Sequence, residues 1–129
     1  MKIDIPSYEE REQAGTQIVI HSWDTWNMDQ TLALIIHPML VQLKKTTHGY
    51  PSNLTEERWN KLLDEMIWAF EQKMDEDWHD QYYGPLVDNP DSFMGQDFEW
   101  VDLDGLQKHQ ERMTQGFRLF GRYYENLWD

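Results

Sequence analysis

The sequence predicts a mainly α-helical fold, a compact bundle of three principal helices with minor β or irregular segments. Three long stretches repeat apolar residues at spacings of three and four, the period of an amphipathic helix. Gly and Pro residues separate these stretches. A chain of 129 residues has the length of one domain and buries enough surface to fold without disulfides or metals. We expect a single helical domain over residues 1–129, with a peripheral N-terminal segment at 1–21 and an acidic aromatic loop at 75–104.

The composition excludes several classes of protein. The chain has no cysteine, which excludes disulfide scaffolds, cysteine-ligated zinc and thiol catalysis. Free nucleic acid and anionic membranes require a cationic face, which a formal net charge of -13 does not favour. The longest unbroken apolar run, Leu32 to Ile36, is too short to span a membrane, and the first 15 residues have no apolar signal-peptide region. We therefore expect no nucleic acid and no membrane as partners.

The N-terminal segment predicts two short strands. Ile3 and Ile5 alternate with charged residues and stop at Pro6, which is the pattern of an edge strand. The β-branched run from Thr16 to His21 predicts a second strand.

The stretch from Ser22 to Gly49 predicts the helix around which the others pack. Ser22 and Asp24 are candidate N-caps, and Gly49 is the predicted stop. Pro38 lacks a backbone donor and clashes one turn back, so it predicts a kink or break. The expected buried face consists of Met28, Leu32, Ile35, Ile36, Met39, Leu40 and Leu43.

The second helix is predicted to begin at Asn53 or Thr55, with Glu56 and Glu57 in its first turn. Its apolar face is a strong amphipathic pattern. The face consists of Trp59, Leu62, Leu63, Met66, Ile67, Phe70 and Met74.

The acidic aromatic loop follows. No Lys or Arg occurs between residues 74 and 107, whereas Asp, Glu and aromatic residues accumulate there. Gly84-Pro85, Asn89-Pro90 and Gly95 mark turns. So many aromatic residues argue against disorder, and we predict a packed loop with a short strand over Phe98–Leu103. Loops of this length in compact domains are often binding elements.

The last helix is predicted from Leu106 to Leu127, and the run Asp102 to Gly105 is explained best by a turn before its N-terminus. Gly116 and Gly121 each cost up to about 1 kcal/mol in a helix interior and would permit close approach of a neighbouring helix or a ligand. The apolar face consists of Leu106, Met113, Phe117, Phe120, Tyr124 and Leu127.

One set of residues suggests a ligand-binding pocket. Cations end the first helix and line the third, and aromatic rings beside them would stack on a base or nucleotide ring. The alternative, which we favour, is that these cations only pair with neighbouring acids. The candidate residues are Trp23, Trp26, Lys44, Lys45, His48, Tyr50, Arg112, Arg118, Arg122 and Tyr123.

A metal site is the weaker alternative. The dipeptide His79-Asp80 is the one that names the HD phosphohydrolases, and Asp64 and Glu65 supply further carboxylates. The spacing of these residues is not diagnostic, and a solvated acidic helix face explains the carboxylates better. We therefore assign no catalytic residue, no metal and no cofactor.

Three segments together resemble a family of small acidic proteins encoded by tailed bacteriophages: DTWNMDQTLALIIHPMLVQLKKTTHGYP, WNKLLDEMIWAFEQKMDEDW and HQERMTQGFRLFGRYYENLWD. The resemblance covers most of the chain from Trp23 to Asp129, apart from the acidic loop. It implies a phage origin and action in the cytoplasm of the infected bacterial host. It implies no activity, and no catalytic residue is carried over.

These observations lead to one functional expectation and three alternatives. We expect a phage accessory protein, a binding protein rather than an enzyme, that inhibits a host defence factor through its acidic, aromatic-rich surface. The alternatives are sequestration of a nucleotide-type signalling molecule in the cationic pocket, a metal-dependent nucleotide hydrolase, and a virion or assembly component. The abundant Trp and Tyr residues also make a homodimer plausible.

Overall fold

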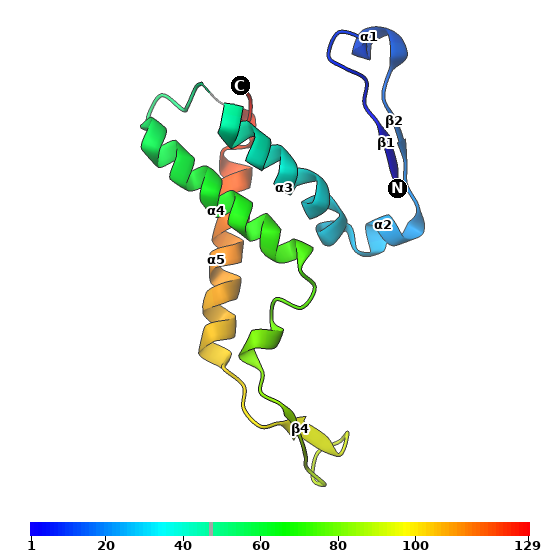
Figure 1. Cartoon of the computed structure of the whole chain (residues 1–129), viewed down its shortest axis with the longest axis vertical. Coiled ribbons are helices and arrows are strands. Elements are labelled where there is room, and N and C mark those ends of the chain that lie inside the picture. The colour runs from blue at the N-terminus through cyan, green and yellow to red at the C-terminus, as the bar shows by residue number, and fades with distance from the viewer. Residues whose placement is uncertain (47) are drawn as a thin grey trace.

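The computed structural model describes residues 1–46 and 48–129. It confirms the mainly α-helical class: three long helices, α3 (Met28–Thr46), α4 (Glu56–Met74) and α5 (Leu103–Arg122), pack together. Helix α4 contacts both α3 and α5 and is the shared element of the bundle (Figure 1). No helix in the described ranges is long and apolar enough to cross a membrane.

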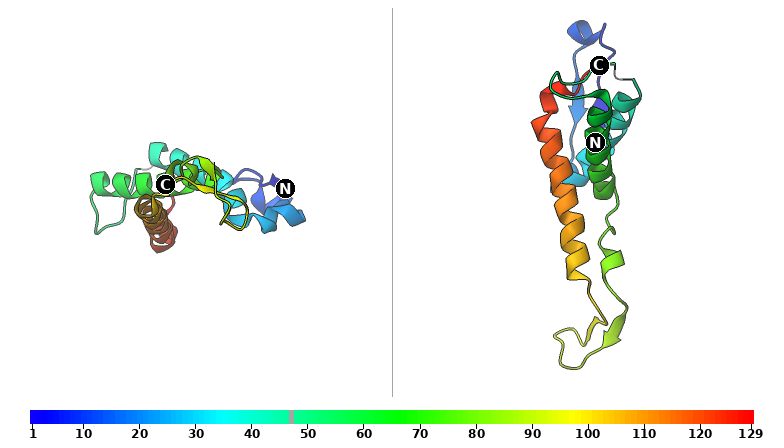
Figure 2. Two further views of the ribbon diagram at one scale, coloured as in Figure 1. Left: turned by 90° about the horizontal axis from the view of Figure 1, so that it is seen from below. Right: turned by 90° about the vertical axis from the view of Figure 1, so that its left-hand side faces the viewer.

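Eight short elements complete the chain. They are β1 (Lys2–Asp4), α1 (Arg11–Ala14), β2 (Gln17–Val19), α2 (Ser22–Trp26), the 3-10 helix η1 (Asp80–Tyr82), β3 (Leu86–Asp88), β4 (Gln96–Phe98) and the 3-10 helix η2 (Tyr124–Asn126). The strands form two separate antiparallel pairs, β1 with β2 and β3 with β4. We call residues 1–20 the N-terminal arm and residues 75–102 the acidic arm. The tips of the two arms lie towards opposite ends of the long axis of the molecule (Figure 2).

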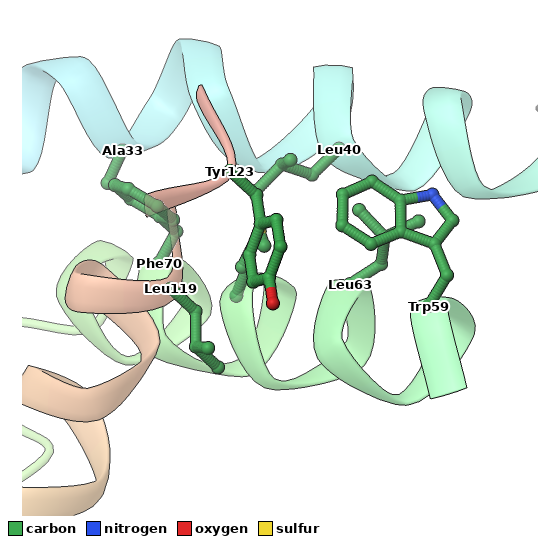
Figure 3. Close-up of a cluster of buried hydrophobic side chains, with 8 residues drawn as sticks. Ala33, Leu40, Trp59, Leu63, Phe70, Leu119 and Tyr123 are labelled. Carbon is green, nitrogen blue, oxygen red and sulfur yellow. The ribbon is translucent and has the colours of Figure 1, made fainter. Parts of the chain in front are cut away.

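The hydrophobic core lies where α4 meets its two neighbours (Figure 3). Trp59 of α4 meets Tyr123 edge-to-face, with ring centroids 5.5 Å apart. The predicted apolar face of α4 is confirmed, because all seven of its residues are buried or pack against the core. The buried core cluster consists of Ala33, Leu40, Trp59, Leu63, Met66, Phe70, Leu119 and Tyr123.

Gly116 explains how closely α5 approaches α4. A Cβ at this position would lie 2.8 Å from the Glu65 carbonyl oxygen and closer still to the Ala69 Cβ. The predicted close approach of a helix is therefore confirmed at Gly116. Gly121 has nothing within 4 Å of the same hypothetical atom, so its lack of a side chain serves no close contact.

The central helix differs from the prediction at both ends. A turn at Asn27 divides it into α2 and α3, and His21, rather than Ser22 or Asp24, precedes the first turn. Asp24 instead accepts a hydrogen bond from the His21 N–H at 2.7 Å. Helix α3 ends at Thr46, before the predicted stop at Gly49, and residue 47 lies outside the described ranges. The helix runs without a break through Pro38.

The predicted buried face of α3 is too wide. Leu40 is buried and Ile36 and Leu43 are partly buried, but Met28, Leu32 and Met39 are exposed. The physical reason is that α3 packs only on α4 among the long helices, so one side of its apolar stripe has no covering element.

The starts of the other two helices follow from their caps. Thr55 accepts a hydrogen bond from the Arg58 N–H at 3.2 Å and so caps α4. Of the two predicted starts of this helix, the structure therefore confirms Thr55. Asp102 accepts from the Gly105 N–H at 2.9 Å, so α5 begins three residues earlier than predicted. It ends at Arg122, and η2 replaces the predicted last turn. The strand predicted over Phe98–Leu103 lies instead at Gln96–Phe98, because this cap commits Leu103 to the helix.

Candidate functional site

The acidic arm is the candidate functional site. It contains nine Asp or Glu residues and no Lys or Arg. Strands β3 and β4 pair antiparallel with Leu86 opposite Phe98 and Asp88 opposite Gln96. The arm extends the molecule beyond the ends of α4 and α5 (Figure 1). It therefore presents a narrow, negatively charged projection rather than a cavity.

The tip of the acidic arm is held by its own hydrogen bonds. The Asn89 N–H donates to the Gly95 carbonyl at 2.9 Å, and the Gly95 N–H donates to the Ser92 carbonyl at 3.0 Å. The Ser92 hydroxyl donates to the Gln96 carbonyl at 2.8 Å. Gly95 has a φ of 74°, a conformation that favours glycine. The tip backbone is thus fixed without help from the rest of the protein.

Two large apolar side chains project from this tip. Phe93 is 101% exposed and Met94 is 79% exposed. Acidic residues flank them in sequence on both sides, Asp88 and Asp91 before and Asp97 after. Sequence reasoning counted Phe93 among the aromatic residues of the loop but did not single out this pair. The available signal was two large apolar residues between the turn markers Asn89-Pro90 and Gly95.

His109 of α5 anchors the base of the acidic arm. Its Nδ1 lies 2.7 Å from the Tyr82 hydroxyl and its Nε2 lies 3.0 Å from the Gln72 side-chain oxygen. Because this oxygen can only accept, Nε2 carries the proton and Nδ1 accepts from the Tyr82 hydroxyl. The ring stacks on Trp78 with centroids 4.5 Å apart. One side chain thus connects α4, α5 and the arm.

The environment of His109 favours its neutral form. Burial lowers the pKa of the imidazole below its usual value, and the positive charge of Arg112 lowers it further. Arg112 itself donates two hydrogen bonds to Glu65, at 3.1 and 3.0 Å, and its guanidinium lies 3.8 Å from the ring centroid of Trp68. Trp68 also contacts His109, with centroids 5.0 Å apart. A spacing of three residues places Trp68 beside Glu65 on α4, and the same spacing places Arg112 beside His109 on α5. No pattern in the sequence predicted that these two helix faces meet.

A second set of contacts orients the two strands of the acidic arm. The Gly84 N–H donates to the Trp100 carbonyl at 2.8 Å, and a Cβ on Gly84 would lie 2.6 Å from the indole nitrogen of Trp100. Tyr83 pairs with Val101 in an isolated bridge, and its ring lies 4.7 Å from that of Phe98. The arm therefore leaves the helices in a defined direction.

Three basic residues of the predicted ligand pocket, Lys44, His48 and Arg112, lie beside carboxylates. The Lys44 ammonium lies 2.6 Å from Asp64, and the His48 ring lies 3.4 Å from Asp129. Arg112 is paired as described above. The Arg122 guanidinium lies 5.5 Å from the ring centroid of Tyr123, and Lys45 is exposed on the last turn of α3. Lys44 and Arg112 thus follow the alternative in which cations pair with neighbouring acids.

The aromatic members of that predicted pocket are also dispersed. Trp23 and Trp26 form an exposed edge-to-face pair on α2, with centroids 5.1 Å apart. Tyr50 is exposed in the connection to α4, whereas Tyr123 is buried in the core. Arg118 is one of the residues that line a hollow of about 530 Å³ on the polar face of α5. A second, apolar hollow of about 760 Å³ between α3 and the end of α5 contains none of the ten residues.

The weaker metal alternative is not assembled either. Asp64 and Glu65 are paired with Lys44 and Arg112, and His79 contacts Asp80 at 3.5 Å beyond the end of α4. Within residues 1–46 and 48–129, no three His, Asp or Glu side chains gather closely enough to hold a metal ion. The four residues of the hydrolase alternative therefore do not converge.

Comparisons of the chain with protein-family models, with curated proteins and with solved structures find no match.

Proposed function

We propose that this chain is a phage accessory protein that acts by binding, and that the acidic arm contacts and inhibits a protein of the bacterial host. The observation that carries the proposal is the fully exposed Phe93 at a tip whose backbone is internally fixed. A soluble chain gains nothing from a rigidly presented aromatic side chain in water, whereas a binding surface does, because little order is lost on association.

The side chains of the tip indicate the kind of partner that would fit it. Phe93 and Met94 would enter an apolar pocket, and burial of each side chain would contribute roughly 1.5–3 kcal/mol. The carboxylates around them, such as Asp91 and Asp97, would meet a rim of Lys or Arg. Proteins that bind nucleic acid have such basic surfaces, so a host protein of this kind fits the charge. Action in the host cytoplasm is part of the same proposal and rests on the resemblance to phage proteins.

The test compares capture of host proteins by matched variants. The wild-type chain is immobilised, host lysate is passed over it at low salt, and captured proteins are quantified by mass spectrometry. We expect one basic host protein at near-stoichiometric abundance, and at least tenfold less of it with Phe93→Ser/Met94→Ser. Tyr8→Ser is the control, because Tyr8 is an 84% exposed aromatic residue of the other arm.

Three results would count against the proposal. Equal capture by the tip variant would remove the acidic arm as the contact. If the amount of captured protein does not decrease when the salt concentration is raised from 50 to 300 mM, the electrostatic part of the proposed contact is wrong. A bound species of a few hundred daltons in native mass spectrometry, with no captured protein, would favour nucleotide sequestration instead.

A specific observation also favours one second function, that of a virion or assembly component. The two projecting arms expose many apolar side chains, as subunits of larger assemblies do before they associate. Detection of the chain in purified phage particles by mass spectrometry would support this function, and its absence from them would exclude it.

A further inference from the structure

The N-terminal arm has one apolar face and one polar face. Strands β1 and β2 pair with Ile3 opposite Ile18, Lys2 opposite Val19 and Asp4 opposite Gln17. Opposed residues of an antiparallel pair lie on the same face, and faces alternate along each strand. One face therefore carries Ile3 and Ile18, and the alternation adds Met1, Ile5 and Ile20.

Nothing in the described parts of the chain covers this apolar face. We call α3, α4 and α5 together the helical body. None of these helices packs against β1 or β2, and the arm joins the helical body through α2. Ile3 remains 42% exposed and Ile18 50% exposed. A two-stranded hairpin with an uncovered apolar face is marginally stable in water, so a partner that covers it would stabilise it. The body of this chain does not supply that partner.

The total surface leaves room for a large contact. The chain exposes 9985 Å². A folded monomer of its 15.7 kDa is expected to expose about 7,300 Å². The surplus is about 2,700 Å², whereas an obligate dimer buries upwards of about 1,000 Å² on each protomer. The surplus is spread over the whole molecule, both arms included, and it exceeds the area that one such contact buries on a protomer.

Charge limits the surfaces that can face a second copy. The chain has a net charge of -13, so most surfaces of two copies repel each other. The face of Met1, Ile3, Ile5, Ile18 and Ile20 has no charged side chain, and the N-terminal ammonium of Met1 is paired with the Asp24 carboxylate at 3.3 Å. In a two-fold dimer the same patch meets itself, which an apolar face tolerates and an acidic face does not.

We infer that the apolar face of the N-terminal arm is a homodimer interface, in which the β1–β2 sheet of one protomer packs face to face on that of its partner. Two stacked two-stranded sheets make a small sandwich whose inner faces are the Ile side chains, at the sheet spacing of about 10 Å. Trp23 and Trp26 of α2 lie directly after β2 and enlarge the contact with aromatic surface. The acidic arms remain outside it.

The oligomeric mass tests this inference. Light scattering coupled to size-exclusion chromatography at tens of micromolar should give about 31 kDa for the wild-type protein, twice the 15.7 kDa of one chain. Ile3→Ser/Ile18→Ser should raise the dimer dissociation constant at least tenfold and return the mass to that of one chain. The helical body should keep its circular dichroism, since neither residue belongs to its core.

The opposite face of the same hairpin supplies the matched control. Asp4→Ser/Gln17→Ser changes an opposed pair in the same strands but on the polar face, and it should leave the dimer intact. A monomeric wild-type protein at tens of micromolar, a larger assembly, or a dimer that survives the double Ile variant would each overturn the inference. Phe93→Ser/Met94→Ser should not change the mass, so failure of the dimer and failure of the proposed host contact are distinguishable.

Discussion

The two arms are both antiparallel hairpins with three-residue strands, yet they differ in how they are attached and in how their charges are distributed. The acidic arm is fixed to the helices by His109, which bonds Tyr82 and Gln72 and stacks on Trp78. Among the described residues, neither strand of the N-terminal arm packs on α3, α4 or α5. The arm is joined to α2, where the Met1 ammonium lies 3.3 Å from the Asp24 carboxylate. The acidic arm would repel a second copy, whereas the N-terminal arm has the apolar face that we propose as the homodimer interface. Exposed apolar residues therefore support different proposals in the two arms. On the fixed tip of the acidic arm they support a contact with a host protein, and on the uncovered sheet of the N-terminal arm they support a contact with a second copy.

Gly116→Leu should have the largest effect, because it separates the two helices that hold the acidic arm. The new side chain would meet the Glu65 backbone, and overpacking of this kind costs about 3 kcal/mol of the free energy of unfolding. Urea denaturation monitored by circular dichroism measures this loss. Gly121→Leu is the control: with open space around Gly121, it should leave stability unchanged or raise it by up to about 1 kcal/mol. Equal losses in both variants would mean that the close approach at Gly116 is not what matters.

His109→Ala should release the acidic arm without unfolding the bundle. The variant leaves the Tyr82 hydroxyl and the Gln72 amide without their partner and removes the stacking, a local cost of about 2 kcal/mol. Hydrogen exchange measured by mass spectrometry should become faster over residues 78–102 and stay unchanged over residues 2–19. If exchange also accelerated in the N-terminal arm, the two arms would not be independent.

A fall in pH should also loosen the acidic arm, because it protonates His109. The pKa of His109 is lowered in the folded state, so the unfolded chain binds a proton first as the pH falls. Stability is therefore complete above the usual pKa of about 6.5 and declines as the pH falls from there through the lowered value. Denaturation of the wild-type protein at a series of pH values from 7 to 5 should show this decline. His109→Gln should lose this component of the slope, and an identical slope in the variant would assign it to other groups.

Deletion of residues 1–20 should have the smallest effect on the helical body. Because neither strand of the N-terminal arm packs on the long helices, the free energy of unfolding of the body should change by less than about 0.5 kcal/mol. Thermal denaturation followed at the helical circular dichroism signal, at low micromolar concentration, measures it. A loss above 1 kcal/mol would show that the arm supports the body after all.

Local patterns in the sequence were sufficient for the three helices and the two N-terminal strands. The apolar spacing over Trp59 to Met74 predicted the buried face of α4, since α4 is covered on two sides and every apolar position meets a neighbour. The same reasoning failed on α3, where Met28, Leu32 and Met39 are exposed. Periodicity records which side of a helix is apolar, but only the packing partners determine how much of that side is covered.

Tertiary structure alone decided the candidate site. His109 is far in sequence from both Gln72 and Trp78, and no spacing rule connects it to them, because they meet only after α4 and α5 pack through Gly116. The predicted cationic pocket illustrates the same limit. Lys44 pairs with Asp64 and Arg112 pairs with Glu65, both on α4, and the charge composition does not indicate these partners. The sequence by itself determined a mainly helical, acidic chain with a turn-rich loop, since these depend on short-range preference and composition. Which side chains meet depends on long-range packing, and only the folded chain decides it.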